Sequence, residues 1–271
     1  MDLKTLENMP PWEWPEDAGA LFLETLRNEQ ADEEDRLLAA ELGGDYVVIN
    51  DELAEALLAI LLNGGESEAL RAKAAISFGA ALEQADIDEF DDPDDVPISE
   101  QTFHKIKATL RTLYTDPTVP MQVRRRILEV AVRAHEDWQA DAVRAAYASD
   151  QEDWRLTAVF CMRFVRGFDA QIVESLGSSN PEIEYEAVCA AGNWQVDAAW
   201  RHIVALVTSE DTDKDLLLAA IEAAVYIRPK EAADVLGGLM DSDDEDIVEA
   251  VHEALAMAEG PWDEDDDDSG L

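Results

Sequence analysis

Apolar residues recur along this chain with the period of a helix, and residues 180–192 show the pattern most clearly. Asn180 can cap a helix and Pro181 suits its first position. From Ile183, apolar residues follow at steps of four, seven and eight, which places them on one stripe of a helix. Gly192 then closes the segment. The pattern predicts a helix that buries one face and ends at this glycine.

The same template recurs through the chain, and its fullest form adds an arginine directly after the first apolar residue. Residues 70–79, LRAKAAISFG, fit it at every step. The residues at the +4 position of each copy are Ala39, Ala74, Ile127, Ala158, Ala187, Ala220 and Val251. They are separated by 35, 53, 31, 29, 33 and 31 residues. A repeat of about 30 residues that contains two helices predicts an α-solenoid, in which each pair stacks on its neighbours.

The predicted fold is therefore all-α, a solenoid of about seven antiparallel helix pairs over residues 17–259. The long interval of 53 residues contains an acidic insertion at about 86–98, which reads DEFDDPDDVP in part. Residues 260–271 are a run of like charges, and we expect an acidic disordered tail there.

Residues 1–16 contain Trp12 and Trp14 bracketed by three prolines. Prolines disfavour a helix, so the segment is expected to form an extended strap. The two tryptophans are expected to cover the open end of the first helix pair, since terminal repeats need a cap. The alternative is a docking motif for another protein.

Three segments, LRAKAAISFG, WRLTAVFCM and IEYEAVCAAG, resemble HEAT repeats, specifically the short type also found in phycobilisome-lyase-like proteins. The resemblance extends from about Asp17 to Ala258. It implies a superhelix that acts as a scaffold or adaptor, since most HEAT proteins do. A few relatives bind chromophores, and some basic ones act on DNA.

The formal net charge of −42 excludes several classes of partner. Nucleic acids and anionic membranes need a basic surface, so neither is expected. The acidity has two general explanations. It would keep an extended monomer soluble. It would also fit an adaptation to high salt, since Arg (14) outnumbers Lys (6). The specific alternatives are attraction of a basic protein partner and mimicry of nucleic acid. Residues 99–167 differ from the rest, with eleven Lys and Arg against nine Asp and Glu.

The sequence shows no basic segment followed by an apolar run at its start and no stretch of ~20 apolar residues. Its two cysteines, Cys161 and Cys189, cannot form a disulfide framework. We therefore expect a cytoplasmic protein.

No residue pattern indicates a reaction or a bound group. The four histidines are scattered, and the sequence has no phosphate-binding glycine loop, nucleophile elbow or zinc-ligand spacing. The acidic insertion lacks the glycine and the closing glutamate of a calcium-binding EF-hand loop. The expectation is a protein that is not an enzyme and that holds no metal and no cofactor.

The second helix of each pair supplies the candidate binding residues. With the +0, +4, +7 and +8 positions buried, the +2, +6 and +9 positions lie on the opposite face, which lines the concave surface of HEAT-like solenoids. The residues predicted there are Arg125, Glu129, Leu156, Phe160, Arg163, Tyr185 and Cys189. Aromatic residues beside arginine are typical of interaction hot spots. The alternative is that Phe160 and Tyr185 pack on a neighbouring helix.

The sequence thus favours a scaffold or adaptor that binds another protein through its concave face. Two alternatives stay open, a small-molecule-binding or lyase-like HEAT protein and an acidic inhibitor that mimics nucleic acid.

Overall fold

The computed structural model describes residues 2–90 and 96–258, and within these ranges all regular secondary structure is helical. The chain divides into two compact units, residues 1–142 and 143–271. The boundary falls inside α9 (Trp138–Tyr147). Each unit is described by itself.

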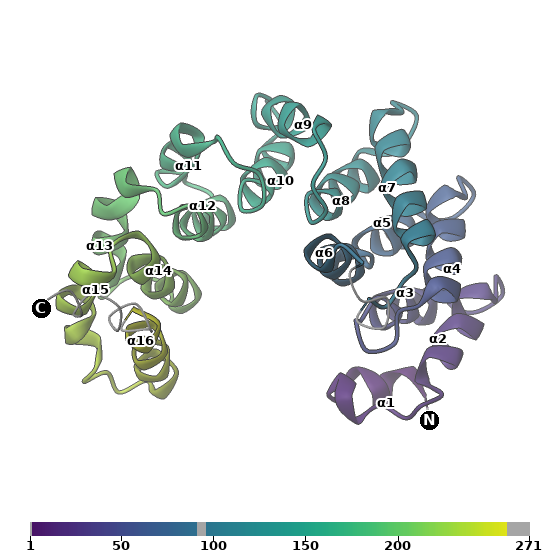
Figure 1. The fold of residues 1–271 in the computed structure, drawn as a ribbon, viewed down its shortest axis with the longest axis horizontal. Helices are drawn as coiled ribbons and strands as arrows, with labels where there is room; N and C mark the ends of the chain where they lie inside the picture. Colours follow the sequence, from purple (N-terminus) through teal and green to yellow (C-terminus); the bar gives the residue numbers. More distant parts are fainter. Residues whose placement is uncertain (1, 91–95, 259–271) are drawn as a thin grey trace, which may run out of the picture. The chain divides into compact units, whose positions relative to one another are not determined.

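The first unit consists of two layers of helices. Its first helices are α2 (Ala18–Arg27), α4 (Asp51–Leu62) and α7 (Glu100–Thr115), which pack on one another in that order (Figure 1). Its second helices are α3 (Glu33–Gly43), α5 (Glu68–Ile76) and α8 (Met121–Ala131), which form the other layer. Each first helix also packs on the second helix that follows it.

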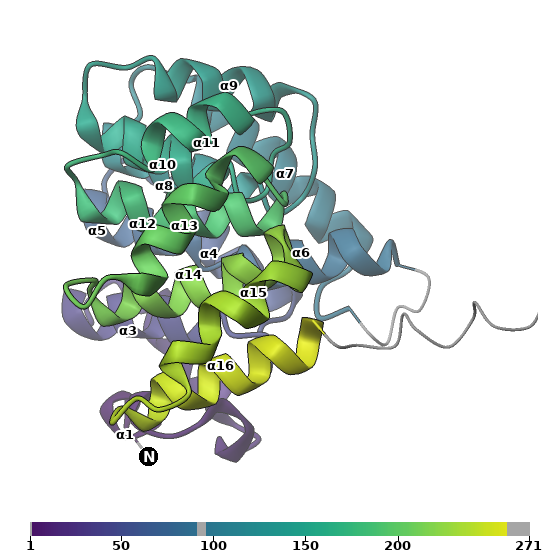
Figure 2. The same cartoon turned by 90° about the vertical axis from the view of Figure 1, so that its left-hand side faces the viewer.

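The second unit repeats this arrangement. Its first helices after α9 are α11 (Asp169–Ser175), α13 (Trp200–Thr208) and α15 (Pro229–Leu236). Its second helices are α10 (Glu152–Cys161), α12 (Pro181–Asn193), α14 (Lys214–Ile227) and α16 (Glu245–Ala258). Figure 2 shows the second helices one below another, and each packs on the next. Within residues 2–90 and 96–258 the helix order gives seven pairs, and the predicted all-α solenoid is confirmed.

The seven residues at the +4 position are the most buried points of the repeat. All of them, from Ala39 in α3 to Val251 in α16, have no exposed surface. Small side chains at this position in α3, α5, α10, α12 and α14 let neighbouring helices approach closely, as dense interior packing requires. The spacing read from the sequence therefore corresponds to the real repeat of the core.

The predicted end of the helix at Gly192 is wrong, because α12 continues to Asn193. The glycine is needed for close approach of two helices. A Cβ atom built on Gly192 would lie 3.0 Å from the Cα of Ala223 in α14. Gly44, just after α3, lies against Ser77 in the same way, and a Cβ there would be 2.3 Å from the Ser77 carbonyl oxygen.

The arginines at the +1 position of the template have a structural role. Arg36 Nη2, Arg71 Nε and Arg124 Nε each donate a hydrogen bond to the backbone carbonyl ten residues earlier, at 3.3, 3.0 and 2.8 Å. Each acceptor lies in the last turn of the first helix of the same pair. Carbonyls at a helix end have no partner within the helix, so the arginines satisfy them and join the two helices.

Residues 1–16 differ from the expected extended strap. Residues Leu3–Glu7 form the short helix α1, and Pro11–Glu13 form a 3-10 turn. The helix forms ahead of the prolines, where Asp2 caps it by accepting a 2.9 Å hydrogen bond from the Thr5 backbone N–H.

The insertion begins earlier than expected. Residues Gly79–Asp88 form an additional helix, α6, which packs against α7 and α8. The rest of the acidic segment, residues 91–95, and the predicted tail lie outside the described residues.

Candidate functional site

Arg163 is the centre of the candidate site in the second unit. It lies just after α10, and its Nη1 donates a 3.1 Å hydrogen bond to Oε2 of Glu186 in α12. Its guanidinium carbon is 5.8 Å from the ring centroid of Phe160, one helical turn earlier. Its Nε atom is buried and has no hydrogen-bond partner among the described residues. The side chain thus links the end of α10 to the middle of α12, the neighbouring second helix.

Tyr185 and Cys189 stand one turn apart on α12 and interact with Arg163. Burial opposes the positive charge of Arg163, but its pKa is raised, because Cys189 and Glu186 favour the charged form. Burial raises the pKa of the Cys189 thiol, and Arg163 only partly offsets this. The pKa of Tyr185 is raised by Cys189 and by burial. At neutral pH these shifts leave the tyrosine and the thiol as neutral hydrogen-bonding groups beside a charged guanidinium.

The five residues predicted in this unit are half-buried rather than fully exposed: Leu156, Phe160, Arg163, Tyr185 and Cys189. The last four form the interacting group around Arg163. Phe160 also contacts Phe164, with ring centroids 5.5 Å apart. Each side chain therefore packs within the protein and still presents part of its surface to solvent. The ring contacts of Phe160 are with Arg163 and Phe164 of the same segment, and its role as a binding residue stays a prediction.

Arg125 and Glu129, the two predicted site residues of the first unit, are buried, and each has only 5% of its surface exposed. Arg125 Nη1 donates a 3.0 Å hydrogen bond to Gln122 Oε1, and Glu129 pairs with Arg126. The prediction that both face solvent is wrong. Helix α8 packs against α5, α6 and α7, so more than one stripe of its circumference is covered. The candidate site is therefore built on the four residues of the second unit.

Glu186 is part of this site but was missed in the sequence. It occupies the +3 position of the template, about 60° around the helix from Cys189. The pattern of buried positions does not separate it from the many other carboxylates of the chain. Only the packing of α10 on α12 brings it to Arg163.

Basic side chains are extensively paired with carboxylates of the same chain. At least nine of the 20 Lys and Arg residues form such pairs: Arg36–Glu66, Lys73–Glu41, Lys105–Glu55, Lys107–Asp86, Arg126–Glu129, Arg133–Glu83, Arg163–Glu186, Lys214–Asp244 and Arg228–Asp197. Most of these pairs join neighbouring repeats. The excess of 42 negative charges has no counterpart among the basic residues of the chain.

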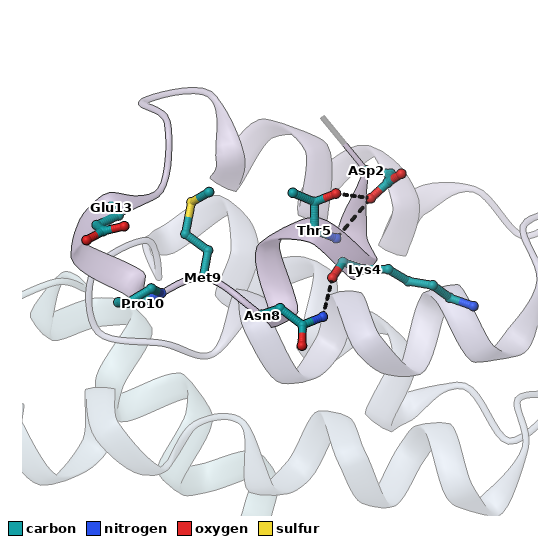
Figure 3. A pocket seen from close by; sticks show the side chains of 7 residues that line it. All are labelled: Asp2, Lys4, Thr5, Asn8, Met9, Pro10 and Glu13. Carbon is teal, nitrogen blue, oxygen red and sulfur yellow. Dashed lines mark hydrogen bonds between the residues drawn. The ribbon is translucent and has the colours of Figure 1, made fainter.

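A hollow of about 570 Å³ lies at the N-terminal end of the first unit (Figure 3). It is lined by Asp2, Lys4, Thr5, Asn8, Met9, Pro10 and Glu13. Its polar groups are engaged locally: Thr5 Oγ1 donates to Asp2 Oδ1 at 2.7 Å, and Asn8 Nδ2 donates to the Lys4 carbonyl at 2.8 Å. The hollow is therefore an irregularity of the surface at this end of the unit. The residues that line it do not form a set of polar groups that converge on a ligand.

Within residues 2–90 and 96–258, His, Cys, Asp and Glu side chains form no group of three that could hold a metal ion. None of the helices described is both long enough and apolar enough to cross a membrane.

Comparisons with known proteins find similar solved structures but no family. No family model and no curated protein matches this chain. The YibA protein of Escherichia coli matches with a TM-score of 0.48 and 17% identity over 93% of this chain and 90% of that chain. Human deoxyhypusine hydroxylase in complex with glycerol matches with a TM-score of 0.42 and 16% identity over 95% and 88%. An engineered protein matches with a TM-score of 0.46 and 18% identity over 76% and 96%.

YibA and deoxyhypusine hydroxylase are all-helical proteins of HEAT-like repeats. The expectation that this chain is not an enzyme needs correction at this point. One of the matched structures is an enzyme by its name, so the lack of an activity does not follow from this architecture. At 16% identity, the match assigns no activity to this chain either.

Proposed function

We propose that this protein is an adaptor that binds a basic partner protein through the surface formed by α10 and α12 of its second unit. The observation that supports this most is the excess of negative charge, together with the pairing of at least nine cations inside the chain. A surface with unbalanced carboxylates attracts a basic protein over long distances and increases its association rate at low salt.

The Arg163 cluster, defined as Phe160, Arg163, Tyr185, Glu186 and Cys189, would provide the specific contact. Half-buried aromatic rings lose little conformational freedom on binding, and Tyr and Arg are enriched among residues that dominate interface energies. Arg163 is held by Glu186 and by the Phe160 ring, so it is already oriented before a partner arrives. Tyr185 would offer a neutral hydroxyl group to carbonyl or charged groups of the partner.

The experiment that tests this proposal is affinity capture with mass identification, followed by titration of the purified partner. Replacing both Phe160 and Tyr185 by Ala should weaken binding about thirty-fold or more, the loss typical of a hot spot. Tyr226→Ala is the matched control, because Tyr226 is a 40% exposed tyrosine on α14 of the same unit and lies outside the cluster. Circular dichroism establishes that all variants keep their helical content. Equal affinity of the folded double variant and the control would refute the assignment of the site.

The same experiments distinguish two other functions. The first is small-molecule binding, which the resemblance to short HEAT repeats of the phycobilisome-lyase type implies. A bound chromophore would colour the purified protein. A nucleic-acid mimic would capture a DNA-binding protein that nucleic acid displaces competitively. No contact in the described residues favours either of these over the adaptor, for which we propose a cytoplasmic location.

A further inference from the structure

The two tryptophans of the N-terminal segment have opposite environments. Trp14 is half-buried, and its Nε1 donates to the carbonyls of Leu6 and Met9 at 3.0 and 3.1 Å. Its ring lies edge-on to Phe22, with centroids 5.4 Å apart. Trp12, two residues earlier, is 79% exposed. Only one of the two tryptophans that were expected to cover the first helix pair does so, and the other is left in solvent.

The turn that carries Trp12 is held in place from both sides. Residues Pro11–Glu13 form the 3-10 turn, closed by a 2.9 Å hydrogen bond from the Glu13 N–H to the Pro10 carbonyl. Prolines at 10, 11 and 15 restrict the backbone dihedral φ along the segment. Trp14 anchors the end of the turn to the helix layers. Trp12 is thus presented on a pre-organised backbone, which lowers the entropy lost when it binds.

Two hollows border this turn. Pro10 and Glu13 line the hollow of about 570 Å³ in Figure 3. Pro11 and Trp14 line another, of about 370 Å³, whose far side is formed by the ends of α3 and α5 and the start of α6. The surface around Trp12 therefore has a shape typical of an interface, in which an exposed ring lies next to two hollows.

The charged residues around the turn are mostly negative. Glu7, Glu13, Glu16 and Asp17 are all exposed, and residues 2–17 contain a single basic side chain, Lys4. The second hollow is also lined by Glu7, Glu41 and Asp45, with one cation, Lys73, which already pairs with Glu41. A partner that approaches Trp12 therefore meets more carboxylates than basic groups.

We infer that Trp12 is the anchor of a docking surface for a basic protein. The indole would insert into an apolar pocket of the partner, and Lys or Arg side chains at the rim of that pocket would occupy the two hollows and pair with Glu7 and Glu13. Tryptophan is strongly enriched among anchors of this kind. This surface belongs to the first unit and the Arg163 cluster to the second, so the inference does not depend on the proposed function.

Photo-crosslinking at the position of Trp12 tests the inference. The full-length protein carries p-benzoylphenylalanine at position 12, is irradiated in an extract of its source cells, and the adduct is identified by mass spectrometry. A chain with the same group at position 87 is the control, because Ile87 is an apolar residue of the same unit that is 69% exposed. We expect an adduct with a basic protein at position 12 and not at position 87.

Titration of the purified adduct partner then gives the affinities. Trp12→Ala should weaken binding about thirty-fold or more, Trp12→Phe should retain part of the affinity, and Ile87→Ala should change nothing. Glu13→Lys, which keeps the indole, should lower the association rate and reduce its dependence on salt. Trp12, Glu13 and Ile87 are all exposed, so all four variants should keep the melting temperature of the parent.

Four outcomes would overturn the inference. They are the absence of an adduct at position 12, an adduct with a second copy of this chain, an adduct with an acidic protein, and an affinity for Trp12→Ala within two-fold of the parent. A partner that depends on Trp12 but not on Phe160 and Tyr185 would support this surface while refuting the Arg163 cluster, so the two proposals fail separately.

Discussion

Gly192 of α12 lies directly against Ala223 of α14, and no side chain fits between the two backbones at this point. A Cβ on Gly192 would be 3.0 Å from the Cα of Ala223 and 3.1 Å from its Cβ. Two of the best-packed second helices of the second unit meet there, with Ala220 and Ala224 fully buried nearby on α14. The contact shows why the template uses such small residues.

Gly192→Ala should therefore destabilise the protein, although alanine favours helix formation by about 1 kcal/mol over glycine in an exposed helix. Overpacking of a close contact costs about 1–3 kcal/mol, and the backbone of α14 cannot move aside as a flexible side chain would. Chemical denaturation measures the change. Gly64→Ala is the control, because a Cβ there meets nothing within 4 Å. An increase in stability for Gly192→Ala would show that α12 and α14 can separate without cost.

Replacing Arg71 by Met should reduce the free energy of unfolding by about 1–3 kcal/mol. The buried Arg71 Nε donates a 3.0 Å hydrogen bond to the Leu61 carbonyl, and its loss leaves that carbonyl without this donor at the end of α4. Methionine keeps most of the apolar contact, so the change reports on the hydrogen bond. Arg111→Met, at an exposed position of α7, is the matched control. Equal stability of the two variants would contradict a structural role for the arginines of the template.

The pair of Arg36 and Glu66 should make stability depend on pH in the acid range. Nη1 and Nη2 of Arg36 each donate a 2.8 Å hydrogen bond to the Glu66 carboxylate, which lowers the pKa of Glu66 below the ordinary 4.5. A carboxyl with a lowered folded pKa stabilises the protein above its unfolded pKa, and this contribution is lost as pH falls through the folded value.

Glu66→Gln should accordingly lose stability at neutral pH, and the difference from the parent should shrink as the pH falls below about 4.5. Denaturation at several pH values measures it. Glu24→Gln, at an exposed position of α2, controls for the loss of one charge. A difference that stays constant with pH would mean that the ion pair contributes nothing.

Salt should raise the melting temperature. The excess of 42 negative charges repels itself in the folded state, and the Debye length falls from about 10 Å at 0.1 M to about 3 Å at 1 M salt. Screening also weakens exposed pairs such as Lys214 with Asp246, which would act in the opposite direction. Scanning calorimetry in NaCl and KCl decides which effect is larger. A melting temperature that falls with both salts would show that the pairs between repeats outweigh the repulsion.

The sequence alone was sufficient for the helix pairs and their stacking. A solenoid buries its core through contacts between neighbouring repeats, so the core residues of one repeat have an environment similar to that of the core residues of the next. The seven residues at +4, from Ala39 to Val251, could be identified by their spacing and are all fully buried. Local patterning and the repeat period determine such a core, without knowledge of contacts distant in the chain.

Tertiary packing decided where each remaining side chain faces. Arg125 and Glu129 occupy the positions that the helical period places opposite the core, yet α8 has further neighbours and buries them. Trp12 and Trp14 share one short motif, but the carbonyls of Leu6 and Met9 and the ring of Phe22 fix only Trp14 in place. The helical period specifies the direction in which a residue points from the axis of its helix. Whether the residue is buried depends on which other elements lie in that direction, and only the folded chain places them there.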